Sequence, residues 1–305
     1  MANYFDEIRA IVFAKGTKAS KIEKLQSECK CTVYEANRYY MQLRPLMPVA
    51  ERPEGRLRFT IGVEIECYNV DKFAVMDALR ARGIESISTG YDHRDSKSHY
   101  KLGYDGSICG NDGCEVVSPV LKNLKSLKEV CEVINEAGAK VNKSCGLHVH
   151  FGAEKFSVKD WSKIIINYSK IEPIIDAFMA PSRRGGRNNY CKSIYEPARR
   201  LEDNGAGAIE DIIDDCFYSD RYYKVNPCAF VRHKTIEFRQ HQGTTDFEKI
   251  SNWVEFLSRF LDWSIKHDEV MSATSIDSLP FLNEKLRTFY NDRRHQFITM
   301  DTNEE

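Results

Sequence analysis

The chain has 305 residues and a mass of 35.2 kDa, which suits one large domain or one domain with a small appendage. With 42% hydrophobic and 29% charged residues, it is too apolar for a disordered protein. Its 44 Lys and Arg against 45 Asp and Glu leave a net charge of −1. Charge alone therefore attracts the chain neither to nucleic acid nor to an anionic membrane.

Three features predict a reduced, cytoplasmic protein. The first residues, MANYFDEIRAIVFAKG, carry acids where a signal peptide has its basic end. The longest aliphatic runs, such as 164–166, are far shorter than the roughly 20 residues of a membrane span. The 10 cysteines are spread along a long chain without the CxxC spacing of structural zinc sites, so we expect free thiols.

Residues 1–50 are predicted to form a small helical region ahead of the main domain. Ser20 with Glu23, and Thr32 with Glu35, each fit a capping box at a helix start. Short helices in this order are similar to the trihelix of helix-turn-helix domains. The basic residues are interleaved with acids, which favours packing or protein binding over contact with DNA. A stretch rich in Pro and Gly then ends the region.

The remainder reads as a main domain over 57–290, followed by a tail over 291–305. In RFTIGVEIECYNV (58–70), apolar residues alternate with Glu64 and Glu66, which predicts a strand with one apolar face and one face of two carboxylates. We further expect helices at 71–82, 121–137, 157–179 and 246–266, a strand at 145–151 and a hairpin at 228–240. Because there is no βαβ rhythm, the pattern predicts an α+β fold with a largely antiparallel sheet and helices on one face.

Three separated strands each carry ionisable residues two positions apart, with apolar residues between them. These residues are Glu64, Glu66, His148, His150, Glu237 and Arg239. Residues two apart on a strand point to the same side, about 6.5–7 Å from one another. If the three strands are neighbours, all six side chains converge on one face of the sheet.

Glu115, in GCEVVSP, adds a fourth carboxylate to this face. Four carboxylates on a surface poor in water are costly unless cations lie among them. Carboxylates with few softer ligands suit Mg²⁺ or Mn²⁺, which keep part of their water and bridge to phosphate oxygens. Each pair alone is ordinarily a solvated strand face or a cross-strand ion pair. The conjunction of the three pairs favours a metal site.

One rival metal motif is present. His148, His150 and Glu154 match the HxH-x3-E part of a cupin motif and would indicate a metal-dependent oxygenase or hydrolase. Trp161 stands where that motif continues with glycine, and no second cupin motif follows. The sequence has no phosphate loop, dinucleotide fingerprint, GxSxG elbow or HExxH motif.

In order and approximate spacing, several segments resemble the amidoligase family, a branch of the glutamine synthetase-like carboxylate–amine ligases. The segments are GVEIE (62–66), DGS (105–107), EVVSP (115–119), CGLHVH (145–150), RNNYC (187–191), YYKVN (222–226) and TIEFRQHQGT (235–244) followed by Asp246. The resemblance covers residues 57 to about 270 and leaves the first 55 residues outside. It implies a curved antiparallel sheet that holds two or three divalent ions, with ATP and a substrate carboxylate meeting there.

The resemblance also implies roles for residues of this sequence. Glu64, Glu66, Glu115, His148 and Glu237 match metal ligands, His150 lies beside the ATP phosphates, and Arg239 contacts the transferring phosphoryl group. Glu64, Glu237 and Arg239 are the catalytic candidates. The candidates for substrate binding are Asp105, Arg187, Asn188, Tyr190, Lys224 and Asn226. The loop that carries three of these also holds Arg183 and Arg184; it would bind a carboxylate or the leaving phosphate, or else be a basic surface loop.

The activity that the resemblance implies is amide formation through an acyl phosphate, with ATP and Mg²⁺ or Mn²⁺ as cofactors. The substrates would be an amine and the carboxylate of an amino acid, a peptide or a protein side chain. KSCG (143–146) lacks the asparagine–glycine amine contact of glutamine synthetase at 143–144, which favours an amine larger than ammonia. A binding or regulatory module with a degenerate ligase domain is the remaining alternative. We expect no membrane partner, a nucleic-acid partner at most for the N-terminal helices, and an oligomer as an open option.

Overall fold

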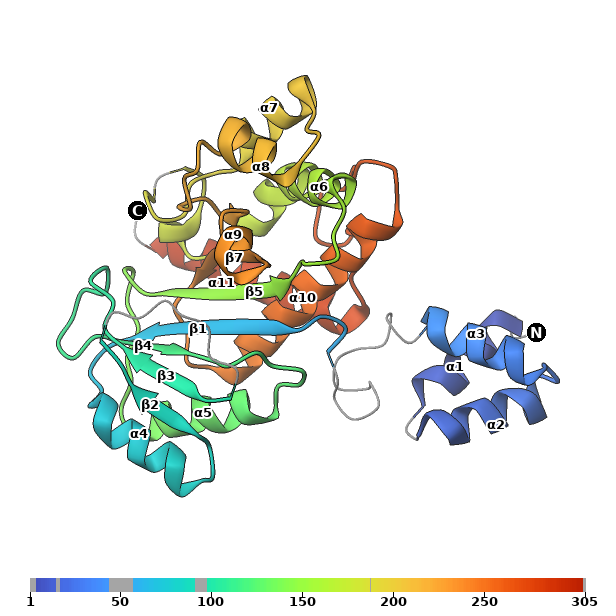
Figure 1. Ribbon diagram of the computed structural model, residues 1–305, viewed down its shortest axis with the longest axis horizontal. Helices are drawn as coiled ribbons and strands as arrows, with labels where there is room; N and C mark the ends of the chain where they lie inside the picture. The colour runs from blue at the N-terminus through green and yellow to red at the C-terminus, as the bar shows by residue number, and fades with distance from the viewer. Residues whose placement is uncertain (1–3, 15–16, 44–56, 91–97, 187, 304–305) are drawn as a thin grey trace. The chain divides into compact units, whose positions relative to one another are not determined.

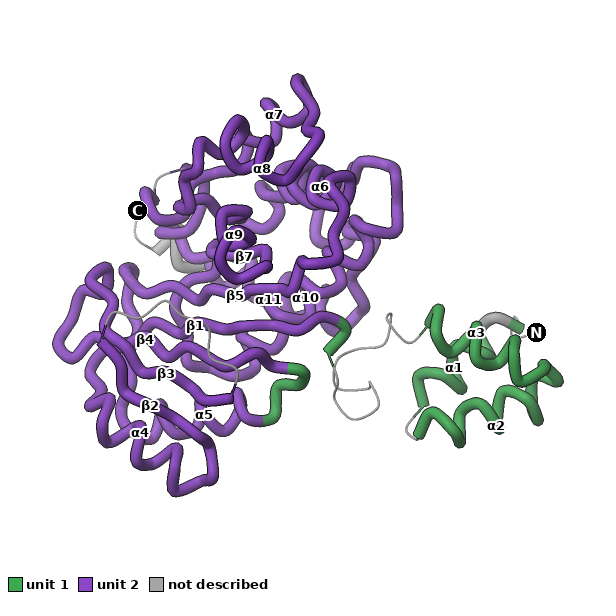
Figure 2. The backbone as a smooth tube through the Cα atoms, viewed as in Figure 1, with its two compact units in different colours: residues 1–58, 122–125 green, residues 59–121, 126–305 purple. Residues whose placement is uncertain are grey.

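The computed structural model describes residues 4–14, 17–43, 57–90, 98–186 and 188–303. The chain divides into two compact units, residues 1–58 with 122–125 and residues 59–121 with 126–305 (Figure 2). Among the described helices, none combines the length and apolarity needed to cross a membrane.

The first unit contains three helices (Figure 1): α1 (Tyr4–Phe13), α2 (Lys18–Glu28) and α3 (Val33–Leu43). They share a small core of buried apolar side chains: Ile8, Ile11, Val12, Ile22, Leu25, Cys29, Ala36, Tyr40 and Leu43. The predicted helical N-terminal region is therefore present.

Two predictions about helix starts in this unit have opposite outcomes. The Thr32–Glu35 capping box is confirmed, because the Glu35 carboxylate accepts the Thr32 N–H at 2.8 Å and Thr32 Oγ1 accepts the Glu35 N–H at 3.2 Å. The Ser20–Glu23 box is wrong. Helix α2 begins three residues earlier, where Thr17 Oγ1 accepts the Ser20 N–H at 3.2 Å. Several polar residues in a row offered alternative caps, and the sequence did not separate them.

The second unit contains one sheet and the remaining helices (Figure 1). Its strands are β1 (Ile61–Cys67), β2 (Ser86–Ser88), β3 (Tyr100–Gly103), β4 (Cys114–Val117), β5 (Gly146–Gly152), β6 (Val225–Asn226) and β7 (Thr235–Gln242). Its helices are α4 (Lys72–Ala81), α5 (Lys125–Glu136), α6 (Val158–Asp176), α7 (Tyr195–Asn204), α8 (Ile209–Asp211), α9 (Ala229–His233), α10 (Phe247–Lys266) and α11 (Glu284–Asn303), with a 3₁₀ turn η4 (Pro181–Arg183) and a π-helical turn η5 (Ile212–Cys216).

The strands lie in the order β2-β3-β4-β1-β5-β7-β6. All pairings between these strands are antiparallel except β2 with β3. The predicted α+β class with a largely antiparallel sheet is confirmed, and the parallel β2–β3 pair makes the sheet formally mixed.

One face of the sheet is apolar and covered by helices. Phe238 of β7 illustrates this, because its ring contacts Phe151 of β5, Tyr168 of α6 and Phe260 of α10 at centroid distances of 5.9, 5.5 and 6.4 Å. Burial of such side chains stabilises the fold by about 25 cal/mol per Å² of apolar surface. The opposite face of the same strands is thereby free to carry polar residues.

The predicted hairpin at 228–240 is only half correct. Its second strand is β7, but residues 229–233 form the short helix α9 instead of a strand. The turn begins after Pro227, whose carbonyl accepts the Phe230 N–H at 2.9 Å, and it ends at Lys234 in a left-handed conformation (φ 55°). A run of four or five apolar and polar residues fits one helical turn as well as a strand.

Of the predicted tail, residues 291–303 are described and are helical. Helix α11 extends from Glu284 to Asn303, and Arg293 within it is buried. Tyr290 of the same helix packs on Phe178 at a centroid distance of 4.4 Å. Helix α11 is therefore part of the second unit.

Candidate functional site

The strand register brings the predicted ionisable residues together on the polar face of the sheet. Glu64 of β1 lies opposite His148 of β5, and Glu66 lies opposite Glu115 of β4. His150 in turn lies opposite Glu237 of β7. Since directly opposed antiparallel residues have Cβ atoms about 4.5–5.5 Å apart, these side chains must contact one another.

A bulge in β7 adjusts the aim of Arg239. Val149 pairs with Phe238 but Leu147 pairs with His241, so two residues of β7, Arg239 and Gln240, face the single residue His148. A bulge of this kind bends the strand and re-aims a side chain. Arg239 points to the polar face, where its Nη1 donates to Glu237 Oε1 at 2.6 Å.

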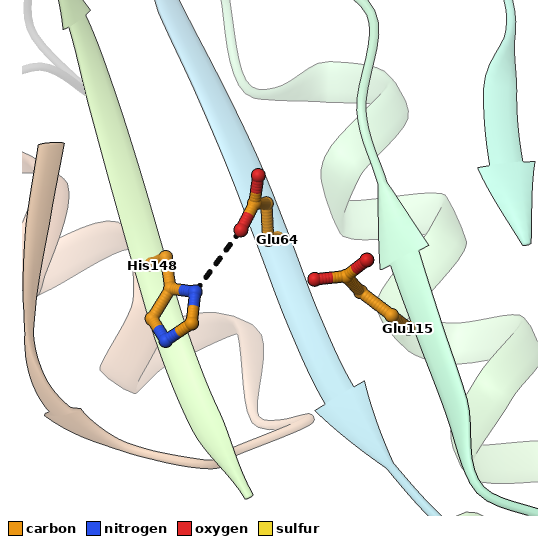
Figure 3. Close-up of side chains that lie close together, drawn as sticks. All are labelled: Glu64, Glu115 and His148. Carbon is orange, nitrogen blue, oxygen red and sulfur yellow. Dashed lines mark hydrogen bonds and ion pairs between the residues drawn. The ribbon is translucent and has the colours of Figure 1, made fainter. Parts of the chain in front are cut away.

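Three sets of ligand atoms in this cluster are close enough to hold a cation. The sets are Glu64–Glu115–His148, Glu64–His150–Glu237 and Glu66–Asp105–Glu115, and the atoms within each lie within 4.8 Å of one another. Figure 3 shows the first set, in which side chains from three neighbouring strands point toward one another. Two of the sets combine carboxylate oxygens with one imidazole and the third has carboxylates alone, and such donors fit Mg²⁺ or Mn²⁺.

The histidines of β5 lie between the carboxylates of its two neighbouring strands, β1 and β7. His148 Nδ1 and Glu64 Oε2 are 3.0 Å apart, and His148 Nε2 lies 3.7 Å from Glu66 Oε1. His150 Nε2 lies 3.3 Å from Glu64 Oε1, while its Nδ1 is 3.0 Å from Thr235 Oγ1. Thr235 was not a sequence candidate, yet its hydroxyl fixes the orientation of the His150 ring.

The pKa values of the carboxylates separate in opposite directions. Burial alone would raise the pKa of Glu64, but hydrogen bonds from His148 and His150 lower it well below its usual range. Burial raises the pKa of Glu115 well above its usual range, and the neighbouring carboxylates of Glu64 and Glu66 add to the rise. Arg239 acts in the opposite direction but does not cancel this rise, so Glu115 faces an excess of negative charge, which is the situation that a bound metal ion relieves.

Glu237 and Arg239 form an ion pair at one end of the cluster. Burial opposes ionisation of Glu237, but Arg239 and the two histidines lower its pKa. Asn226 of β6 donates to Glu237 Oε2 at 2.6 Å. Burial likewise opposes the charge of Arg239, whereas Glu237 and Glu64 raise its pKa, so the guanidinium stays protonated.

Asp105 combines a turn and a possible ligand position. Its Oδ1 accepts both the N–H and the hydroxyl of Ser107 at 2.6 Å, which is ordinary turn chemistry, and the residue also belongs to the set with Glu66 and Glu115. The neighbouring loop is held by Ser144, whose Oγ accepts the Cys109 N–H at 2.8 Å.

In the described part of the arginine-rich loop, the Asn188 side chain bonds to the backbone on both sides. Asn188 uses both ends of its amide within the loop, donating to Ser182 O at 3.0 Å and accepting the Tyr190 N–H at 2.8 Å. Tyr190 has an exposed ring, and its carbonyl lies 3.4 Å from Arg239 Nε. Arg187 lies outside the described residues. Substrate binding by these three residues stays a prediction.

Lys224 lies in a second buried cluster. Its ammonium, 0% exposed, donates to Glu172 Oε1 at 2.8 Å and to Asp176 Oδ1 at 2.7 Å. Gln240 also donates to Asp176 Oδ1, at 2.6 Å. Sequence analysis missed both carboxylates, because each stands alone on the helical pattern of α6. This pairing leaves substrate contact by Lys224 without support from the geometry.

The rival HxH motif receives no support. Glu154 is exposed, and none of the three cation-compatible sets found among the described residues includes it. Both histidines of the motif instead face Glu64 and Glu237.

The comparisons with known proteins agree with this geometry. No curated protein matches the chain significantly. A family model described as "Putative amidoligase enzyme" matches residues 57–261, a segment that contains every member of the carboxylate–histidine–arginine cluster. As this match covers more than half of the chain, the protein belongs to the amidoligase family, a family of ligase-type enzymes.

Proposed function

We propose that this protein is an ATP-dependent carboxylate–amine ligase that requires Mg²⁺ or Mn²⁺ and forms an amide bond through an acyl phosphate. The observation that carries the proposal is the register-built cluster: four strand carboxylates, two histidines and one arginine on a single sheet face. Such an excess of carboxylates over protein cations is costly at neutral pH, and bound metal cations relieve that cost.

The residues divide into two roles. Glu64, Glu66, Glu115, His148 and Glu237 would hold the divalent ions, which when bound neutralise phosphate oxygens and fix their position. Arg239, with its fixed planar fork, would contact the γ-phosphoryl group during transfer, and His150 would contact the neighbouring phosphates. Phosphoryl transfer depends mainly on positioning and charge stabilisation, which is what this set of residues supplies.

The reaction then follows in two steps. A substrate carboxylate oxygen attacks the γ-phosphorus of ATP and ADP leaves, which gives an acyl phosphate. An amine attacks the acyl carbon, loses a proton and expels phosphate. The burial of Glu66, His148 and Glu237 limits the access of water, which would otherwise hydrolyse the acyl phosphate.

Thermal unfolding of the full chain tests the proposal. Mg²⁺ with a non-hydrolysable ATP analogue at 100 times the dissociation constant should stabilise the protein by about 2.7 kcal/mol. In a chain of this size, this raises Tm by about 5 °C. Glu237→Ala should abolish the shift, and Glu154→Ala, the matched control from the rival motif, should retain it.

Two outcomes would contradict the proposal. The first is no shift with the Mg²⁺–nucleotide complex, combined with stabilisation by Zn²⁺ or Fe²⁺ that Glu154→Ala removes, because that pattern belongs to the HxH metalloenzyme. The second is an equal nucleotide-dependent shift in wild type and Glu237→Ala.

A further inference from the structure

Arg183, in the turn η4 at the start of the arginine-rich loop, is a buried cation beside the cluster. Its side chain is 3% exposed. The hydrogen bond that holds it is Nη2 to Cys145 O at 2.5 Å, while Nε is buried without any partner. The ion pairs of the described residues include none to Arg183.

The guanidinium occupies a place on the polar sheet face that a glycine leaves open. Gly146, His148 and His150 alternate along β5, so a side chain at 146 would point to the same face as the histidines. A Cβ at 146 would lie 3.2 Å from Arg183 Nη2 and 2.7 Å from His148 Nε2. Arg183 therefore lies beside His148, over Gly146.

Two titratable groups close to Arg183 are neutral and do not balance its charge. Burial raises the pKa of the Cys191 thiol, which lies against the guanidinium and stays neutral. Burial and two arginines, Arg293 and Arg183, lower the pKa of His241 to about 3, so that ring is neutral too. A buried guanidinium with a carbonyl for a partner and one unused N–H is costly unless a ligand provides an anion.

Arg239 and Arg183 lie at opposite ends of the cluster. Arg239 pairs with Glu237 at the end where His150 lies. Arg183 lies at the end marked by Glu66, whose Oε2 accepts the Gly146 N–H at 2.6 Å, and Glu66 belongs to the set with Asp105 and Glu115. The reaction requires two anions, a nucleotide phosphate and a carboxylate, on one face.

We propose that Arg183 binds the carboxylate of the acyl substrate at the Glu66 end of the cluster. The absence of a side chain at Gly146 leaves room there for the guanidinium. The inference rests on the proposed function, because Arg239 and His150 are taken to serve the nucleotide. The planar fork of Arg183 fits a carboxylate through two parallel N–H···O bonds. A carboxylate oxygen of the ligand would accept the N–H of Arg183 Nε, which has no hydrogen-bond partner among the described residues.

The test is calorimetric titration of the full chain saturated with Mn²⁺ and the non-hydrolysable ATP analogue. The probes are acetate, succinate, L-glutamate and, in a separate arm, inorganic phosphate. Wild type should bind at least one carboxylate, and Arg183→Gln should weaken that binding at least tenfold while analogue affinity changes less than twofold. Arg200→Gln is the matched control, since Arg200 also donates to a backbone carbonyl, that of Cys216, at 2.9 and 2.5 Å; it should change neither affinity.

Arg183→Lys keeps the charge without the fork and should give an intermediate carboxylate affinity, which also covers the case in which Arg183→Gln fails to fold. Several results would overturn the assignment: unchanged carboxylate affinity in both variants, a wild type that binds the analogue but no carboxylate, or Arg183-dependent binding of phosphate alone. If wild type binds no analogue, the proposed function itself fails, which is a separate outcome.

Discussion

Two buried ionic clusters share strand β7 but differ in how their charges are balanced. In the cluster around Lys224, one ammonium faces Glu172 and Asp176, whose remaining oxygens accept the N–H groups of Ile194 at 2.9 Å and Gly185 at 2.8 Å. In the other, the four strand carboxylates face one arginine and two histidines. The first cluster is complete within the chain. The second holds more carboxylates than cations, and its ligand atoms form three sets that fit a divalent cation.

The largest effect should come from breaking the complete cluster. Lys224→Met removes the only described cation that faces Glu172 and Asp176, which leaves two carboxylates uncompensated in the interior. We expect the free energy of unfolding to fall by about 3–5 kcal/mol, measured by urea denaturation.

Lys192→Met is the control for Lys224→Met. Lys192 pairs with Asp220, and both side chains are about one-third exposed (34% and 28%). An ion pair of this kind contributes about 0–1 kcal/mol. A loss below 1 kcal/mol for Lys224→Met would mean that the two clusters do not differ in the way described.

Removing one charge from the carboxylate–histidine–arginine cluster should instead raise the free energy of unfolding, by a smaller amount. Without divalent ions, Glu115→Gln should stabilise the protein at pH 7 by about 1 kcal/mol, because it removes a charge whose pKa burial and neighbouring carboxylates raise. The same variant should lose most of the stabilisation that Mn²⁺ gives to wild type. Urea denaturation with and without Mn²⁺ measures both effects, and Glu154→Gln, at an exposed position, should change neither.

The pH dependence of this effect has a defined sign. The folded pKa of Glu115 lies above its value in the unfolded chain, so the native state binds the extra proton. The contribution of Glu115 to stability is fully present below about pH 4.5 and is lost as the pH rises through the folded pKa. The stability difference between variant and wild type should therefore grow as the pH rises from about 4.5 to the folded pKa and level off above it. A difference that is constant with pH would contradict the assigned charge repulsion.

The sequence predicts those parts of the site that depend on residues close together in the chain. Glu64, His148 and Glu237 were predicted to converge because alternation within a strand fixes the face. The antiparallel register then places Glu64 opposite His148, and His150 opposite Glu237. The helix expected at 71–82 is confirmed as α4, which Asp71 caps through its side chain. These are local rules that need only a few neighbouring residues.

The features that the sequence did not predict depend on contacts between distant segments. Asp176 and Lys224 are 48 positions apart, and nothing in either segment alone indicates the pair. The place of Arg183 over Gly146 joins residues from a turn and a strand that no periodicity links. The β7 bulge at Arg239 is likewise invisible in a pattern of alternating residues, since it becomes defined only by the pairing with β5.

The smallest effect on stability should come from Thr235→Val, at a residue that contacts His150 of the carboxylate–histidine–arginine cluster. Val keeps the shape of Thr but removes the hydroxyl 3.0 Å from His150 Nδ1, so the ring loses the contact that fixes its orientation. We expect a loss of about 1 kcal/mol or less in the free energy of unfolding. Affinity for the ATP analogue with Mn²⁺ should fall about tenfold, because His150, the proposed phosphate contact, loses its orienting partner; partners of ligand histidines have effects of this size. Thr245→Val, which removes a hydroxyl bonded to Asn135 at 2.6 Å outside the cluster, is the matched control and should leave that affinity unchanged. Equal affinity in both variants would show that His150 needs no fixed orientation, and the His150 end of the cluster would then lose its place beside the nucleotide phosphates.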